Sequence, residues 1–333
     1  MNYWKNRNFY FILASCLGML VFIRAIPSSQ FPGAEISNGI LRAKIYFPDT
    51  ARGYYQGTRF DWGGVIADLE YQGHSYFGKW YGKHDPKIHD AITGPVESFD
   101  PLGFEEAKPG ETFVKIGVGN LLKPDDKAYR FSIPYEVEDY GKWTVKTGKD
   151  RVEFLHELND ASGYSYLYSK TLKMTEGRAE LVLEHTLKNT GQKKIETKVF
   201  NHNFFMIDNQ KVGPDYRVTF PFPLSLIRNN RGVGDLVEVE GGNIRFLRPV
   251  QPGESVQLFL LGFSERSKDY QVEVQNQRTG AGVRITSDLA ISDLAFWAIS
   301  TTLCPEPYQS IVVEPGQEIK WDLFYNFYTQ ENR

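Results

Sequence analysis

Several segments of this chain alternate apolar and polar residues with a period of two. In RVEFLHEL, residues 151–158, every second position is apolar or aromatic. Such alternation is typical of strands that bury one face of an antiparallel sheet. Segments with this pattern, or rich in β-branched and aromatic residues, predict strands at 40–47, 65–71, 151–158, 166–174, 179–189, 194–205, 255–263, 270–277, 282–287, 293–300 and 318–328.

Turn-forming sequences such as KPDD, EGR, NTGQ, QPGE and EPGQ separate these segments. No long amphipathic helix is evident, and only residues 287–294 could form a turn or two of helix. Neither an internal repeat nor a linker divides the chain. We therefore predict an all-β fold, a large antiparallel β-sandwich in which residues 29–333 form a single domain. A barrel or a propeller is less favoured, because no closing pattern and no blade-length period is present.

The first 28 residues read as a signal peptide, a lipoprotein leader or a membrane anchor. Lys5 and Arg7 precede an apolar run over residues 9–23. This run is shorter than the roughly 20 residues that a spanning helix prefers. The sequence LASC resembles a lipoprotein box with Cys16 as the lipidated residue, but cleavage near Ala25 or an uncleaved anchor also fits. We expect an exported bacterial protein that is periplasmic, membrane-anchored or secreted.

Charge and cysteine content exclude several classes of function. The formal net charge is −3 and basic blocks are missing, which argues against nucleic acid as a partner. Of the two cysteines, Cys16 lies in the leader and Cys304 in the body, so the body has no internal disulfide. Aromatic residues make up 14% of the chain, which suits a large β-sheet and also a sugar site. Nucleophile-elbow, phosphate-loop and dinucleotide motifs are absent.

His202 is the first candidate for chemistry. It stands between Asn201 and Asn203 and is followed by Phe204 and Phe205, at a point where the strand alternation breaks. A histidine there could simply lie at the end of a strand and form hydrogen bonds with the neighbouring asparagine side chains. However, a protonatable ring beside amide groups and an aromatic shelf is also what a sugar site needs.

Glu306 is the second candidate. It lies between Pro305 and Pro307, which donate no backbone hydrogen bond, so we predict a stiff, irregular segment outside any regular ladder. An exposed loop glutamate is the simplest interpretation, but the apolar AFWAISTTL before it indicates a segment that emerges from the core. Glu306 and His202 could form an acid/base pair across a pocket. We expect the carboxylate to favour a charged imidazole.

Residues 53–66 supply a third polar cluster. Arg59 and Asp61 share strand parity and could form a structural salt bridge. Alternatively, Arg59 could present its planar fork to sugar hydroxyls. Trp62 offers a face on which a sugar ring could stack.

Residues 78–99 contain two histidines and several carboxylates. His84 and His89 have a His-x4-His spacing, but they lie in a segment that proline and glycine interrupt. Metal-binding pairs with such spacing normally stand on a helix, so zinc is not favoured, and calcium is equally weak. We predict no metal site.

Together these motifs resemble the aldose 1-epimerase (galactose mutarotase-like) superfamily, over most of residues 36–328. LVLEHTLKNTG followed by FNHNFFMID is similar to the Asn-Thr-Gly strand end and the Asn-His-x-Tyr-Phe motif of that family, with Phe204 where tyrosine is usual. LCPEPYQSIVVEPGQEIKW resembles its Cys-x-Glu-Pro segment and the Pro-Gly-Glu turn that follows. GTRFDWGGVI is similar to its early Gly-x-Arg segment.

The resemblance implies a galactose mutarotase-like supersandwich with His202 as general acid, Glu306 as general base and no cofactor. The sugar-binding residues are then expected to be Arg59, Trp62, His89, Asn201 and Phe204. One departure concerns a second histidine, which many members carry in a His-Gly-Gly or His-Gly-Pro turn. Here ITGPVESF places Thr93 at that position, and His89 or His84 could take the histidine's place.

Three functions are consistent with this resemblance and these candidate residues. The first is an exported aldose 1-epimerase-like enzyme that interconverts sugar anomers by His/Glu acid-base catalysis. The second is a polysaccharide or oligosaccharide lyase or hydrolase that uses the same pocket. The third is a carbohydrate-binding protein without turnover. In each case the partner is a small sugar or an oligosaccharide, and the N-terminus could tether the protein to a membrane.

Overall fold

The computed structural model describes residues 31–227 and 229–330. The predicted leader at residues 1–28 lies outside the described residues. From Phe31 onward the chain forms one unit. Its regular elements, within the described ranges, are strands and two short 3-10 helices, η1 (Ile207–Asn209) and η2 (Ser267–Asp269). The predicted all-β class is therefore confirmed. None of the described helices is long and apolar enough to span a bilayer.

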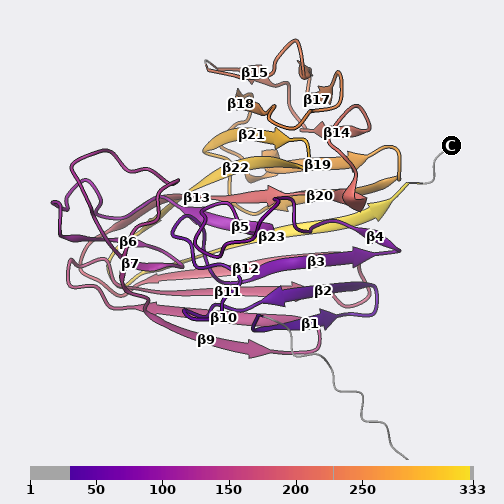
Figure 1. Cartoon of the computed structure of the whole chain (residues 1–333). Coiled ribbons are helices and arrows are strands. Elements are labelled where there is room, and N and C mark those ends of the chain that lie inside the picture. The colour runs from indigo at the N-terminus through magenta and orange to yellow at the C-terminus, as the bar shows by residue number, and fades with distance from the viewer. Residues whose placement is uncertain (1–30, 228, 331–333) are drawn as a thin grey trace, which may run out of the picture. The chain divides into compact units, whose positions relative to one another are not determined.

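A ten-stranded antiparallel sheet forms one layer. Figure 1 shows its strands rising from β9 through β10, β11 and β12 toward β19. Every second side chain of β11 is buried, as the sequence pattern predicts. The strand order is β16 (Val237–Glu240), β17 (Asn243–Phe246), β14 (Tyr216–Thr219), β19 (Gln271–Asn276), β20 (Ala281–Ser287), β23 (Glu318–Thr329), β12 (Glu180–Asn189), β11 (Tyr166–Met174), β10 (Arg151–Leu158) and β9 (Lys142–Thr147).

A six-stranded antiparallel sheet carries the candidate site. The sequence patterns predict neither β5 nor β22 of this sheet. All six residues of β5 are buried, so it shows no alternation, and β22 contains two prolines. The strand order is β15 (Ser225–Leu226), β18 (Val256–Leu261), β21 (Asp293–Ile299), β22 (Thr302–Val313), β13 (Ile195–Phe204) and β5 (Gly94–Phe99).

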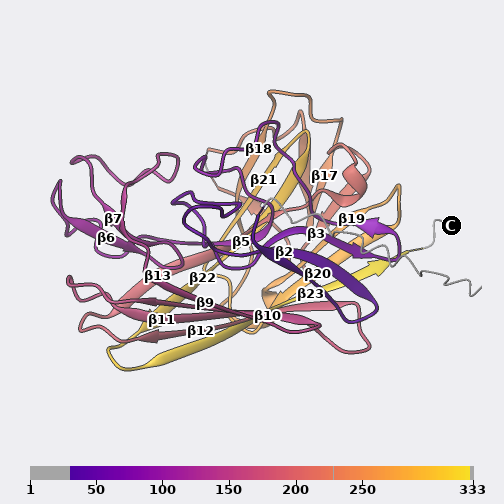
Figure 2. The same cartoon turned by 60° about the horizontal axis from the view of Figure 1, so that its bottom comes forward.

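Two smaller sheets complete the unit. Figures 1 and 2 both place β6 and β7 close to one end of β13. The four-stranded sheet consists of β1 (Gly33–Ser37), β2 (Leu41–Tyr46), β3 (Val65–Tyr71) and β4 (His74–Ser75). The three-stranded sheet consists of β6 (Thr112–Lys115), β7 (Gly119–Leu122) and β8 (Val137–Asp139).

Aromatic contacts join the two large sheets. Phe99 of β5 meets Tyr168 of β11 edge-on at 5.4 Å between ring centroids, and Trp321 of β23 at 6.4 Å. Because β5 belongs to the six-stranded sheet and the other two strands to the ten-stranded sheet, these rings form part of one core between two layers. This confirms the predicted sandwich of antiparallel sheets.

A buried charged cluster interrupts this core. Lys170 of β11 donates a hydrogen bond to Glu97 of β5 and lies 3.5 Å from Oδ2 of Asp61. His185 of β12 and Asn201 of β13 approach Oε1 of Glu97 at 3.0 and 2.9 Å. Burial alone would raise the pKa of Glu97, but the charge of Lys170 and the hydrogen bond from His185 lower it to about 2. An ionised Glu97 thus binds groups from both layers.

Candidate active site

His202 lies near the end of β13, where the neighbouring strands change. On one edge β13 pairs with β5, and His202 stands opposite Val96. On the other edge the ladder to β22 ends at the pair formed by Phe200 and Tyr308. From Val199 onward β13 is buried on both faces, which is why the alternation breaks there. His202 is thus held by a ladder on one edge and faces a gap on the other.

Glu306 lies in β22 and pairs with Ala295 of β21, so the predicted irregular segment is wrong. Asn203 of β13 donates its side-chain amide to the Pro305 carbonyl at 2.8 Å, so this carbonyl faces β13. In an antiparallel strand the N and C=O of one residue point to the same edge. The nitrogens of Pro305 and Pro307 therefore face the gap beside β13, and the edge toward β21 keeps its ladder.

The side chains of His202 and Glu306 meet at this gap. Nε2 of the imidazole lies 3.3 Å from Oε1 of the carboxyl group. The two residues are only 3% and 5% exposed. Phe204 lies parallel to the imidazole at 3.9 Å between centroids, and Phe60 meets it edge-on at 5.6 Å. Because Nδ1 has no hydrogen-bond partner among the described residues, packing against the aromatic rings orients the imidazole.

Burial determines where the proton of this pair resides. It raises the pKa of Glu306 to about 8, against the opposing charge of Arg59. It lowers the pKa of His202 well below its ordinary value, and the charge of Arg59 acts in the same direction. At neutral pH the free protein therefore holds one proton, on the carboxyl group, beside a neutral imidazole. The expected charged imidazole is not favoured, because neither partner is hydrated.

Arg59 is paired with Asp90 and not with Asp61, which corrects the predicted salt bridge. Its guanidinium donates to Oδ1 of Asp90. The same group lies over two aromatic rings, 4.6 Å from the centre of Phe60 and 4.2 Å from that of Phe131. Arg59 is therefore both charge-compensated and fixed in orientation.

A cavity of about 390 Å³ opens at the His202 and Glu306 side chains. Its size falls within the range of small-molecule sites, which is about 300–1,000 Å³. Among the predicted site residues, His202, Glu306 and Arg59 line it. The complete lining is Arg59, Asp90, Ser98, Phe99, Asp100, Lys115, Tyr129, Phe131, Phe200, His202, Gln257, Phe259, Trp297, Glu306 and Tyr308.

Trp62 and Asn201 lie away from this cavity. Trp62 is buried, and its Nε1 donates to the carbonyl of Gly57 at 2.8 Å. Asn201 points to the opposite face of β13 from His202, as successive residues of a strand do, and bonds Glu97. Neither residue is part of the lining, so the sugar contacts predicted for them are not made in this cavity.

Phe204 and His89 are also outside the lining, but each supports a residue within it. Phe204 is fully buried behind the imidazole of His202. Nε2 of His89 lies 3.1 Å from Oδ2 of Asp90. Burial alone would raise the pKa of Asp90, but the hydrogen bond from His89 and the charge of Arg59 lower it to about 2. His89 thus keeps the partner of the arginine ionised.

Among the described residues, no second histidine lines the cavity. Thr93 is buried and donates its hydroxyl to the carbonyl of Ile66 at 2.9 Å. His84 stacks on Tyr54 at 4.3 Å, and its Nε2 lies 2.8 Å from the Tyr54 carbonyl. Within the described ranges, no group of three or more His, Cys, Asp or Glu side chains is placed to hold a metal ion.

Several lining residues were missed by the sequence reasoning. Phe200 and Tyr308 stack on each other at 4.3 Å, and each stands two positions from a member of the acid/base pair. Residues two apart in a strand lie on the same face, so the sequence could have predicted that these two rings lie beside the acid/base pair. Lys115 comes from β6, and Tyr129 from the connection between β7 and β8. No local pattern links those segments to the pair.

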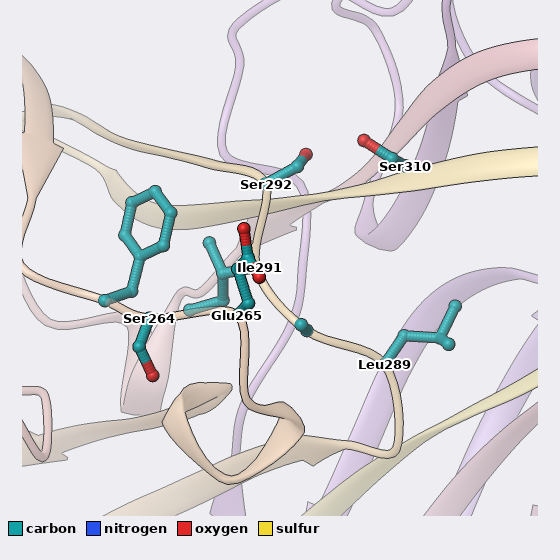
Figure 3. Close-up of a pocket in the computed structure, with 8 residues that line it drawn as sticks. Ser264, Glu265, Leu289, Ile291, Ser292 and Ser310 are labelled. Atoms are coloured by element: carbon teal, nitrogen blue, oxygen red, sulfur yellow. The ribbon is translucent and has the colours of Figure 1, made fainter.

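A larger hollow of about 510 Å³ lies elsewhere on the unit (Figure 3). Among the described residues that line it, Glu265 alone has a titratable side chain. The hydroxyl of Ser264 turns away from Ser292 and Ser310 and donates to Oδ2 of Asp269 at 2.7 Å. This hollow therefore lacks an acid/base pair. It is lined by Phe263, Ser264, Glu265, Leu289, Ala290, Ile291, Ser292 and Ser310.

Comparisons with known proteins bear on the fold. No family model and no curated protein matches this chain. The Slr1438 protein of Synechocystis sp. PCC 6803 is 13% identical, with a TM-score of 0.55 over 90% of this chain and 97% of that one. A galactose mutarotase-like protein of Lactobacillus casei ATCC 334 is 13% identical, with a TM-score of 0.52 over 89% and 100%.

A GalM/aldose epimerase homologue from C. elegans is 14% identical, with a TM-score of 0.51 over 89% of this chain and 98% of that one. At such identities a likeness concerns the fold, since one fold can serve many functions. The described part of this chain therefore has the fold of the galactose mutarotase-like proteins, as the sequence motifs led us to expect.

Proposed function

We propose that this protein is an aldose 1-epimerase-like enzyme that interconverts the α and β anomers of a sugar. The observation that carries the proposal is the approach of His202 Nε2 to Glu306 Oε1, at 3.3 Å, in the wall of the 390 Å³ cavity. The fold that the chain shares with galactose mutarotase-like proteins supports the proposal.

The geometry suits a reaction that moves two protons at a single carbon. Ring opening removes the proton of the anomeric hydroxyl and delivers a proton to the ring oxygen. These two oxygens are bonded to the same carbon, so the base and the acid must also stand close together. His202 and Glu306 meet this requirement because their reactive atoms are direct neighbours.

The proton count also balances. With ionised Glu306 as base and protonated His202 as acid, ring opening leaves a protonated carboxyl, a neutral imidazole and the open-chain aldehyde. After rotation about the C1–C2 bond, the reverse transfers close the ring as the other anomer. The free protein already holds one proton on this pair. Hydrogen bonds from sugar hydroxyls to Glu306 would favour its ionised form and shift that proton to His202.

The cavity walls match a sugar in other respects. A sugar ring presents apolar C–H faces and a rim of hydroxyls, so its sites combine aromatic rings with polar groups. Phe200, Tyr308 and Trp297 supply the rings. Arg59, fixed by Asp90, supplies planar donors for hydroxyls.

The proposal is tested by following anomer exchange of fresh α-glucose and α-galactose by NMR. We expect wild-type protein to accelerate equilibration above the spontaneous rate. Glu306→Gln and His202→Ala should each reduce the acceleration about 10²- to 10⁴-fold, the usual contribution of general acid-base catalysis. Glu265→Gln is the matched control, because it removes the carboxylate of the other hollow. Unchanged exchange in both site variants would refute the assignment.

The same preparations separate the two other functions. Sugar binding in calorimetry without any acceleration by wild-type protein would indicate a binding protein. New ultraviolet absorbance from an unsaturated uronate, on incubation with acidic polysaccharides, would indicate a lyase. Neither result is expected if the pair acts on a free anomeric centre.

We also propose that residues 1–28 direct export. The motivating feature is the basic start followed by the apolar run at residues 9–23. Fractionation of a bacterial host that expresses the full chain should place it outside the cytoplasm. Removal of residues 1–28 should retain it in the cytoplasm, and an equal distribution of both forms would contradict export.

A further inference from the structure

Lys115 is a buried lysine in the cavity wall, and it has no ion-pair partner among the described residues. It ends β6, is only 1% exposed and lines the same cavity as the acid/base pair. Its Nζ donates to the carbonyl of Phe99. No carboxylate oxygen of the described residues lies within 4.0 Å of this nitrogen. Arg59, the other cation of the lining, is already compensated by Asp90.

Tyr129 provides a second unused donor in the same cavity. Its hydroxyl is buried and has no hydrogen-bond partner in the part of the chain that the structure describes. The ring is held by aromatic neighbours, stacking on Tyr135 at 5.5 Å and meeting Phe104 edge-on at 5.5 Å. Nζ of Lys115 lies 5.5 Å from the centre of this ring. An unfilled donor in a cavity wall is available to an acceptor atom of a ligand.

Lys123 shows what a structural lysine looks like in the same small sheet. It is also buried and follows directly after β7. Its Nζ donates to two carbonyls, those of Phe104 and Ala107, at 2.9 and 2.8 Å. Lys123 does not line the cavity. Lys123 thus has two oxygen partners, whereas Lys115 has one and keeps donor capacity for a ligand.

We propose that the sugar bound in this cavity carries a carboxylate, as a uronic acid does, and that Lys115 and Tyr129 bind it. This inference rests on the proposed sugar site and specifies its substrate class. A carboxylate has two oxygens, which match one ammonium and one hydroxyl. A phosphate dianion would require more cationic donors than Lys115 supplies. A neutral hydroxyl would leave the buried ammonium with only the more distant charge of Asp100 to compensate it.

The electrostatics of the wall agree with this assignment. Burial lowers the pKa of Lys115 to about 7, although the charge of Asp100 opposes the effect. The charge of Arg59 lowers it further. A bound carboxylate would favour the ammonium form by adding an opposite charge closer than that of Asp100.

Binding can be measured without turnover, by calorimetry with the Glu306→Gln variant. The ligands are galacturonate and glucuronate, the matched neutral hexoses, and galactose 6-phosphate. We expect the uronates to bind about tenfold or more tightly than the neutral hexoses, as a charge-assisted hydrogen bond allows. Lys115→Met should bring uronate binding to the level of the hexoses, and Lys123→Met should leave the preference intact. Tyr129→Phe, which removes one oxygen atom, should weaken uronate binding and spare hexose binding.

Equal binding of uronates and hexoses would overturn the inference, as would tighter binding of the phosphate ester. If Lys115→Met and Lys123→Met lose uronate binding and hexose binding to the same extent, Lys115 has a purely structural role. That result would also overturn the inference. Failure of the proposed function is a separate result. In that case wild-type protein would bind galacturonate in preference to galactose but accelerate the anomer exchange of neither.

Discussion

Asn203 of β13 donates its side-chain amide to the carbonyl of Pro305 in β22 at 2.8 Å. Its side-chain oxygen accepts a hydrogen bond from the Tyr325 hydroxyl, also at 2.8 Å. The first bond crosses the gap that begins where the ladder between the two strands ends. His202 and Glu306 each stand one position from an end of this bond. An amide side chain thus replaces a missing ladder hydrogen bond and sets the spacing of the proposed catalytic atoms.

Replacing Asn203 by alanine should affect both stability and catalysis. The change leaves the Pro305 carbonyl and the Tyr325 hydroxyl buried without their partner. We expect the free energy of unfolding to fall by about 1–3 kcal/mol. The rate of anomer exchange should fall further than the loss of folded protein explains, because the side-chain bond that ties β13 to β22 across the gap is lost. Urea unfolding measures the change in stability, and NMR measures the rate of anomer exchange.

Tyr325→Phe is the control for that variant. It removes the hydrogen bond from Tyr325 to Asn203 and keeps the bond between Asn203 and Pro305. Its exchange rate should stay near that of the wild type. If Tyr325→Phe slows exchange as much as Asn203→Ala does, the bond across the gap does not position the pair.

The raised pKa of Glu306 predicts a particular dependence of stability on pH. Burial moves this pKa from 4.5 to about 8, so between these values the folded state holds a proton that the unfolded state releases. The contribution of Glu306 to the free energy of unfolding is therefore fully present below pH 4.5 and falls as pH rises toward 8. The slope is at most about 1.4 kcal/mol per pH unit. Glu306→Gln removes this pH-dependent contribution to the free energy of unfolding.

Urea unfolding of wild type and Glu306→Gln across that pH range provides the measurement. The stability of the variant relative to the wild type should rise with pH and level off above about pH 8. His202 titrates in the opposite sense, because burial lowers its pKa, but it is present in both proteins. A difference that stays constant with pH would mean that Glu306 is ionised in the folded state.

Arg59 should control the alkaline limit of activity. Its charge lowers the pKa of Glu306, and the active free enzyme holds one proton on the His202 and Glu306 pair. Arg59→Met should therefore move the alkaline limb of the pH profile of kcat/KM to higher pH. Arg59→Lys keeps the charge and should leave the limb in place, while raising KM because the planar fork is lost. If the alkaline limb lies at the same pH in wild type, Arg59→Met and Arg59→Lys, Arg59 does not control it.

The period-two pattern predicts many strands closely, and its failures have physical causes. β3 and β10 coincide with the predicted ranges 65–71 and 151–158, and β10 alternates as expected because it buries one face. β5 escapes prediction because both of its faces are buried. β22 escapes it because proline excludes a ladder on only one edge, and the sequence does not show which edge is paired.

The residues of the site could also be predicted only in part. His202 and Glu306 could be chosen from their local residues and from the family resemblance, and the structure brings them together. The partner of Arg59 could not be chosen, because parity applies to strands and residues 53–64 form none. Asp90 instead reaches Arg59 from another loop. Lys115 enters the cavity from a separate sheet, which only the three-dimensional arrangement reveals.

The buried cluster behind β13 predicts a large effect for one lysine and a small effect for its neighbour on the same strand. Lys170→Met leaves the carboxylate of Glu97 without its cation between the sheets, which should cost about 3–5 kcal/mol of unfolding free energy. Lys173→Met breaks an exposed pair with Glu184 and should cost about 0–1 kcal/mol. Adding Glu97→Gln to Lys170→Met should recover part of the loss, because an amide needs no counter-ion. Urea unfolding of the four proteins measures these differences, and equal costs for the two lysines would show that the cluster contributes little to holding the sheets together.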